Sequence, residues 1–134
     1  MVLMENDVIF AYMNEEDRNH YAAVRVFDKL RNGELKVDLP GITLLEMELI
    51  YRTQGRESEL LRIMSALLTL PNVNFVPLTP EIIITSVRLR ERVGLSFFDS
   101  HYAATALYLN GKVISFDEAY GKVPGIARID PKEM

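Results

Sequence analysis

The side chains of this sequence that could do chemistry are carboxylates, because the chain has no cysteine and only two histidines, His20 and His101. The absence of cysteine excludes disulfides, thiolate zinc sites, iron–sulfur clusters and a cysteine nucleophile. We expect both histidines at the surface. A metal site would therefore use oxygen ligands, which suit Mg²⁺, Mn²⁺ or Ca²⁺. No glycine-rich phosphate loop, nucleophile elbow, His-Glu-x-x-His or EF-hand pattern offers another chemistry.

Glu46 lies on the apolar side of a predicted helix. On a helical wheel over residues 42–54 it falls between Ile42, Leu49 and Ile50. A carboxylate buried there needs a partner, and a divalent cation is a partner that favours its charged form. A second interpretation stays open, in which Glu46 reaches the edge of the helix or pairs with an arginine.

Two aspartates occupy positions that suit both a cap and a ligand. Asp99 precedes a helical run, so it is a candidate N-cap, yet it shares a direction with the alanines that would press against the sheet. Asp117 ends a predicted strand and either caps the next turn or faces a site. Ser115 lies on the same face of that strand and could orient Asp117.

The elements that would position these acids are short strands alternating with helices. We predict strands at 2–3, 35–39, 73–78, 112–116 and 127–129, and helices at 8–13, 18–31, 42–54, 58–70, 80–93 and 99–109. Parallel neighbours need crossover connections, so this order predicts a three-layer α/β/α sandwich with a central parallel sheet. Ligands bind such sheets at the carboxyl ends of the strands, where Glu5, Asp7 and Asp117 fall.

Length and charge limit the class of protein. With 134 residues, 49% of them hydrophobic, we predict a single domain over residues 1–134. No apolar run is long enough for a bilayer and the N-terminus lacks a basic signal region, so we expect a cytoplasmic protein with no membrane contact. The net charge of -4 argues against a general nucleic-acid coat, but not against an enzyme that touches RNA locally. Asp38 is expected to be a solvated turn residue.

The order of the acids resembles the PIN-domain ribonucleases, particularly the toxin-like members called VapC. The shared motifs are Leu-Leu-Glu-Met-Glu-Leu around Glu46, Leu-Ser-Phe-Phe-Asp ending at Asp99, and Val-Ile-Ser-Phe-Asp ending at Asp117. The likeness covers essentially the whole chain. It implies a PIN-like fold in which Glu46, Asp99, Asp117 and, at the family's first acid, Glu5 act as catalytic ligands of Mg²⁺ or Mn²⁺.

The first motif departs from the family pattern. Members usually have Asp-Thr-Asn-Val or Asp-Thr-Asp-Val, whereas this chain has Glu5, Asn6 and Asp7 before Val8. Glutamate is one methylene longer than aspartate, so it could keep a metal contact, directly or through water, or weaken the site. We expect Asn6, Asp7 and Ser115 to lie behind the metal ligands and support them.

The resemblance implies an endoribonuclease that hydrolyses RNA phosphodiester bonds as the toxin of a toxin–antitoxin pair. It also implies a homodimer and a small cognate antitoxin. Arg52, Arg56 and Lys122 are candidates for holding the RNA backbone. The alternative is an inactive PIN-like domain that binds RNA or protein, which Glu5 favours. A receiver-like phosphoacceptor domain also uses strand-end acids, but Lys112 begins its strand at the wrong end for that chemistry.

Overall fold

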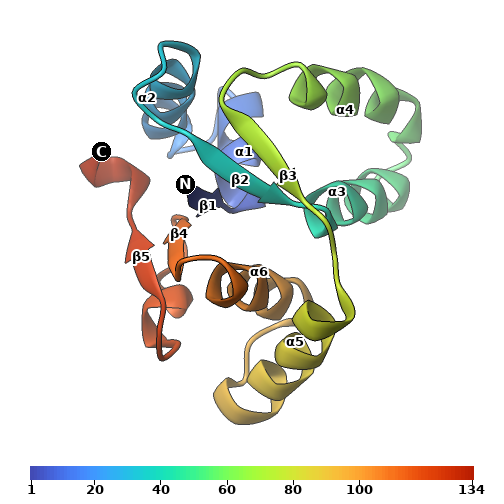
Figure 1. Cartoon of the computed structure of the whole chain (residues 1–134). Helices are drawn as coiled ribbons and strands as arrows, with labels where there is room; N and C mark the ends of the chain where they lie inside the picture. The colour runs from blue at the N-terminus through green and yellow to red at the C-terminus, as the bar shows by residue number, and fades with distance from the viewer.

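The computed structural model describes residues 1–134 and has a five-stranded parallel sheet at its centre (Figure 1). The strands are β1 (Val2–Met4), β2 (Val37–Pro40), β3 (Val73–Val76), β4 (Lys112–Ile114) and β5 (Ala127–Ile129). Their order is β3-β2-β1-β4-β5, and every neighbouring pair is parallel. The predicted parallel α/β architecture is therefore confirmed.

Six α-helices and two short 3₁₀ helices connect the strands, and a third 3₁₀ helix follows the last strand. The α-helices are α1 (Asn6–Met13), α2 (His20–Arg31), α3 (Ile42–Thr53), α4 (Leu60–Leu68), α5 (Pro80–Val93) and α6 (Phe97–Tyr108). The 3₁₀ helices are η1 (Glu57–Glu59), η2 (Glu118–Lys122) and η3 (Pro131–Glu133). None of the helices combines the length and apolar character that crossing a bilayer requires.

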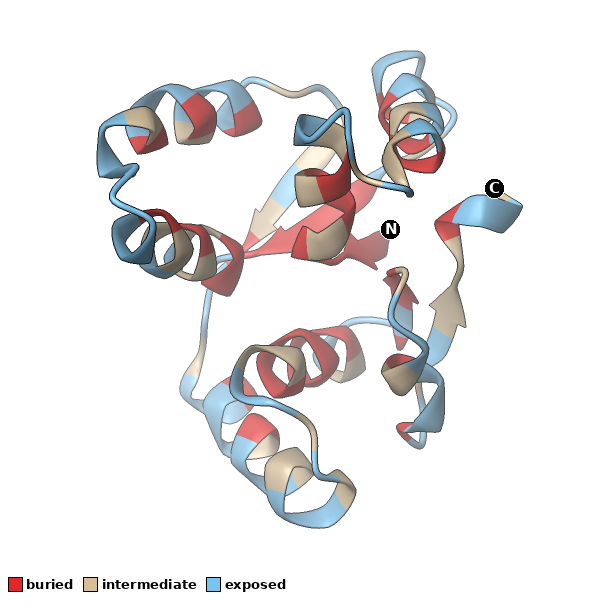
Figure 2. Ribbon diagram, turned by 180° about the vertical axis from the view of Figure 1, so that it is seen from behind, coloured by how far each residue is buried: buried red, intermediate tan, exposed pale blue.

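Alternating side chains of the central strands supply two separate cores. Val2 and Met4 of β1 pack with residues of α1, α2, α3 and α4 on one face of the sheet. Leu3, between them, packs on the other face with α6 and Val113 of β4. Figure 2 shows the result, with buried residues concentrated in the central strands and on the inward sides of the helices. The period of two in a strand thus accounts for helices on both faces.

The strand order reverses between β1 and β4. The chain moves from β1 outwards to β2 and β3, and then returns to place β4 and β5 on the other side of β1. The register pairs Met4 with Ile114, and the backbone N–H of Glu5 donates to the carbonyl oxygen of Ile114 at 3.0 Å. The residues that follow β1 and β4 therefore lie side by side at a switch point, where ligands of α/β sheets bind.

Three local predictions are wrong. Helix α6 begins two residues earlier than expected, because the Ser96 hydroxyl caps it by accepting from the N–H of Asp99 at 3.3 Å, so Asp99 is not the cap. His101 is buried, not exposed, with its ring against that of Phe97, and burial together with the charge of Arg90 on α5 lowers its pKa. Asp38 is also buried, and it accepts a hydrogen bond from the Asn74 side chain on the neighbouring strand.

Gly111 joins α6 to β4 at a point of close backbone approach. Its φ is +76°, and a Cβ added there would lie 2.3 Å from the carbonyl oxygen of Gly125. Gly33 has a similar φ of +83°, but a Cβ there would meet nothing within 4 Å. Both positions have a positive φ that favours glycine, and only at Gly111 would a Cβ also clash with the backbone.

We expect Gly111→Ala to lower the free energy of unfolding by about 1–3 kcal/mol more than Gly33→Ala, because overpacking adds to the backbone strain that both variants share. Urea denaturation of the two variants beside the wild type measures this difference. Equal losses in the two variants would show that the contact with Gly125 relaxes without cost.

Candidate functional site

Glu5 is the first residue after β1 and caps the N-terminus of α1. Its Oε1 accepts from the backbone N–H of Asp7 at 3.3 Å, and its Oε2 lies 3.2 Å from the hydroxyl of Ser115 at the end of β4. The side chain is only 6% exposed. Both carboxylate oxygens of Glu5 therefore have partners within the protein.

Asp7 points from the first turn of α1 towards the end of β4. Its Oδ2 accepts from the Ser115 hydroxyl at 2.7 Å and from the backbone N–H of Phe116 at 2.9 Å. Because Ser115 has a single hydroxyl proton, the shorter contact makes Asp7 its main acceptor, ahead of Glu5. The other oxygen, Oδ1, is buried and accepts no hydrogen bond.

Glu46 is half-buried on α3 and contacts Asn6, the residue between Glu5 and Asp7. Its Oε1 accepts from the Asn6 side-chain amide at 3.0 Å and from the Tyr102 hydroxyl at 2.7 Å. Asn6 is itself fully buried, and its amide also donates to the carbonyl oxygen of Thr43. The partners of Glu46 are thus an amide and a phenol, and no arginine is among them.

Asp99 approaches from the first turn of α6. It is half-buried, and its Oδ1 accepts from the Tyr120 hydroxyl at 3.3 Å. Sequence reasoning missed both Tyr102 and Tyr120. The signal that could have found them is chemical: a tyrosine in a core needs a partner for its hydroxyl, and nearby acids supply one.

Asp117 takes a different position from the other predicted ligands. It is exposed, and its Oδ1 accepts from the backbone N–H of Ala119, so it caps η2. Its link to the site is its own backbone N–H, which donates to the Ser115 hydroxyl at 3.0 Å. The structure therefore brings together Glu5, Asp7, Glu46 and Asp99, here called the acid cluster, with Asp117 at its edge.

The surroundings of the acid cluster disfavour the charged forms of its carboxylates. Burial raises the pKa of Glu5 well above its usual range, and the charges of Asp7, Glu46 and Asp99 raise it further. Burial also raises the pKa of Asp7, against the opposing effect of its hydrogen bonds to Ser115 and the backbone. None of the five ion pairs of the structure includes a carboxylate of the cluster, and the nearest arginine contact is that of Arg128 with the backbone carbonyl oxygen of Ser115 at 2.9 Å.

The sequence matches a known protein family over most of its length. The family model of the PIN domain matches residues 5–126, from the first acid of the cluster to the turn before β5. The chain belongs to the PIN-domain family. The resemblance inferred from the sequence motifs is thereby confirmed, and the match spans all the acids of the cluster.

Solved structures agree with this PIN fold. FitAcB from Neisseria gonorrhoeae matches with a TM-score of 0.75 at 19% identity, covering 100% of both chains. VapC20 from Mycobacterium tuberculosis, described as a sarcin–ricin loop-cleaving toxin, matches with a TM-score of 0.75 at 15% identity, over 94% of this chain and 97% of that one. A toxin–antitoxin complex from Klebsiella pneumoniae has a TM-score of 0.69 at 19% identity, covering 98% of each chain. No curated protein matches the sequence at a significant level.

The donor chemistry of this PIN domain fits a hard divalent cation. Asp7 Oδ1 and Asn6 Oδ1 are buried without a hydrogen-bond partner, and Glu46 Oε2 and Asp99 Oδ2 accept no hydrogen bond. Oxygen atoms of this kind are the ligands that Mg²⁺ and Mn²⁺ prefer. As the side chains lie, no three acidic or histidine side chains are arranged to bind one ion together. An ion bound here would therefore take one or two carboxylate oxygens from the protein and its other ligands from water, as Mg²⁺ usually does.

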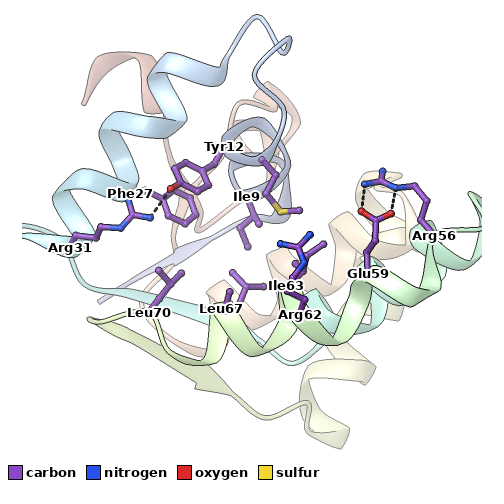
Figure 3. A pocket seen from close by; sticks show the side chains of 12 residues that line it. Ile9, Tyr12, Phe27, Arg31, Arg56, Glu59, Arg62, Ile63, Leu67 and Leu70 are labelled. Carbon is purple, nitrogen blue, oxygen red and sulfur yellow. Dashed lines mark hydrogen bonds and ion pairs between the residues drawn. The ribbon is translucent and has the colours of Figure 1, made fainter.

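The PIN domain also has a groove away from the acids, between α1 and α2 on one side and α4 on the other (Figure 3). It encloses about 510 Å³, and no residue of the acid cluster lines it. Ile63 and Leu67 of α4 contribute to its apolar wall. Arg31, fixed by a hydrogen bond to Tyr12, lies at one end, and Arg56, paired with Glu59 at 2.8 Å, lies at the other.

The charge of Glu5 makes a testable contribution to stability. Folding raises the pKa of Glu5, so the folded protein holds the proton of Glu5 more tightly than the unfolded chain does. The stability that this gives is fully present below the pKa of the unfolded chain, about 4.3, and is lost as the pH rises through the pKa of the folded protein. Without metal, the free energy of unfolding should therefore fall more steeply between pH 5 and pH 8 in the wild type than in Glu5→Gln, which keeps the capping oxygen without the charge.

Urea denaturation in EDTA measures the two pH dependences, with Glu15→Gln, an exposed glutamate on the loop after α1, as the matched control. We expect Glu15→Gln to follow the wild type. Parallel curves for the wild type and Glu5→Gln would contradict the effect of burial and of the neighbouring charges on Glu5.

Proposed function

We propose that this PIN domain is a metal-dependent endoribonuclease and the toxin of a toxin–antitoxin pair. The observation that carries the proposal is the acid cluster, four carboxylates gathered at the carboxyl ends of β1 and β4, none of which forms an ion pair with a lysine or arginine. Mutual repulsion of this kind is relieved by a bound cation. The solved structures with the same fold support the toxin assignment, since they include toxin–antitoxin complexes and an RNA-loop-cleaving toxin.

Glu5, Glu46, Asp99 and Asp117 are the proposed ligands of Mg²⁺ or Mn²⁺, with Asp7 behind them. When bound, such an ion supplies positive charge beside the scissile phosphate and makes a water easier to deprotonate. The protein's own part is to hold the carboxylates in place, through Asn6 for Glu46 and through Ser115 for Asp7 and Glu5. In the proposed hydrolysis, water attacks phosphorus and loses a proton, while the leaving 3′ oxygen departs and gains one.

Of the three cations proposed to hold RNA, two are already paired with acids. Arg52 lies 3.6 Å from Glu57, and Arg56 lies 2.8 Å from Glu59. Lys122 forms no ion pair and lies in η2, the segment that Asp117 caps. This makes Lys122 the proposed contact to the RNA backbone nearest the acid cluster.

A specific observation favours a second candidate, an inactive domain that binds RNA or protein. Glu5 Oε1 already accepts from the backbone N–H of Asp7, and Oε2 lies 3.2 Å from the Ser115 hydroxyl that donates mainly to Asp7, so a cation must compete with the cap. In that case Glu5 would cap α1 instead of binding a metal. The two candidates differ in whether the purified protein responds to divalent cations at all.

We expect the purified protein to cleave mixed RNA with Mn²⁺ and not with EDTA, and Asp99→Asn to lower the rate by at least about tenfold, because it removes a proposed ligand while keeping the size of the side chain. Gel analysis of RNA fragments measures the rate. Asp28→Asn, an exposed position on α2, is the control and should retain activity.

Cleavage that survives EDTA, or that Asp99→Asn leaves unchanged, would contradict the metal-dependent mechanism. A protein that retains RNA without cutting it, and whose melting temperature ignores millimolar Mg²⁺ and Mn²⁺, would instead identify the binding module.

We propose that the antitoxin binds in the groove on the other part of the molecule. The groove between α1, α2 and α4 has an apolar wall, and positive side chains lie along it at Arg31 and Arg62. Arg62 is exposed and forms no ion pair. This combination suits an amphipathic segment of a second protein that carries apolar residues on one face and acidic residues beside them.

Two synthetic helical peptides with the same leucine face, one flanked by glutamates and the other by lysines, test this chemistry. We expect the glutamate peptide to bind more tightly, and Ala66→Glu, which puts a charge into the groove, to abolish its binding. Ser65→Glu, on α4 but outside the groove, should leave it intact. Fluorescence anisotropy measures the affinities. Equal loss in both variants would contradict the groove as the site.

A further inference from the structure

Two fully buried tyrosines reach the acid cluster from the core. Tyr102 of α6 and Tyr120 of η2 are each 0% exposed, and they pack beside Leu3 of β1 in the same core. Tyr102 donates its hydroxyl to Glu46 Oε1 at 2.7 Å, and Tyr120 donates to Asp99 Oδ1 at 3.3 Å. Both phenols therefore end on carboxylates that come from different elements.

Each tyrosine engages only one of the two oxygens of its carboxylate. Glu46 Oε1 accepts from both Tyr102 and Asn6, whereas Oε2 accepts nothing. Asp99 Oδ2 is likewise without a donor. Neither free oxygen is among the buried polar atoms that lack a partner, so both contact solvent. Each carboxylate is thus held by one oxygen on its core side and presents the other.

We propose that Tyr102 and Tyr120 are positioning residues that leave Glu46 and Asp99 one metal-binding oxygen each, and thereby favour Mg²⁺ over Ca²⁺. The inference rests on the proposed function, because it requires the acid cluster to bind a divalent cation. Ca²⁺ takes about six to eight oxygens and often both oxygens of one carboxylate, whereas Mg²⁺ takes an octahedron with few carboxylate oxygens and several waters. A carboxylate with one oxygen already engaged suits the smaller ion.

The environment of the two phenols keeps them as hydrogen-bond donors. Burial raises the pKa of Tyr102 and of Tyr120 far above the usual range, and the neighbouring carboxylates raise it further. Each hydroxyl therefore keeps its proton and offers it to the acid beside it. Because the rings are packed on all sides, the hydroxyls cannot follow a carboxylate that turns to present both oxygens.

The test compares cation selectivity in Tyr102→Phe, Tyr120→Phe and the double variant, which lose the hydroxyls and keep the rings. Titration calorimetry gives the Kd of the wild type and each variant for Mg²⁺ and for Ca²⁺. In the double variant we expect Mg²⁺ affinity to fall by roughly tenfold or more, the usual range for groups that orient metal ligands. Ca²⁺ affinity should fall much less or rise, so the ratio of the two affinities shifts towards Ca²⁺.

Tyr51→Phe is the matched control, since Tyr51 is a buried tyrosine of α3 whose ring faces Arg56 and not the acids. We expect it to keep the wild-type ratio. If Tyr102 and Tyr120 had a purely structural role, the affinities for Mg²⁺ and Ca²⁺ would fall by the same factor. An unchanged ratio of the two affinities would therefore overturn this inference and leave the proposed function standing. A wild-type protein that binds neither ion overturns the proposed function and this inference with it. Melting temperatures in EDTA show whether the double variant is folded. If it is not, the more stable of the two single variants takes its place in the comparison.

Discussion

The repulsion among buried carboxylates at the ends of β1 and β4 is the constraint on which the rest of this structure depends. Glu5 and Asp7 lie in an environment that raises their pKa values, and neither forms an ion pair with a lysine or arginine. What holds them is a set of neutral donors, above all the Ser115 hydroxyl and the N–H of Phe116. Neutral donors orient a carboxylate without cancelling its charge, so the cluster keeps its capacity to attract a cation.

That arrangement exists because of the parallel register of β1 and β4. Pairing Met4 with Ile114 places the next residue of each strand, Glu5 and Ser115, in contact although they are far apart in sequence. Helices α3 and α6 then add Glu46 and Asp99 from opposite sides. Gathering partly buried carboxylates in one place is destabilising, and the two cores on either face of the sheet must offset it.

Much of this could be predicted from the sequence, because it follows from periodicity. Alternating strands and helices predicted the parallel sheet, and acids after strands predicted where carboxylates would gather. The parts that could not be predicted depend on three-dimensional contacts between distant residues. The Tyr102 and Tyr120 hydroxyls look like core aromatics in the sequence, and the burial of His101 depends on how α5 packs. Asp117 had two local roles open to it, and the structure shows it capping η2.

The substitution of glutamate for the family's first aspartate acquires a physical meaning in this context. Glutamate is a poor N-cap compared with aspartate, serine or asparagine, yet Glu5 caps α1 through Oε1. Its longer side chain also brings Oε2 to Ser115, which is shared with Asp7. The extra methylene thus ties the start of α1 to the end of β4 through one carboxylate. The hydrogen bond of Glu5 to the backbone N–H of Asp7 stabilises the start of α1, whereas burial of its carboxylate beside other acids works against folding.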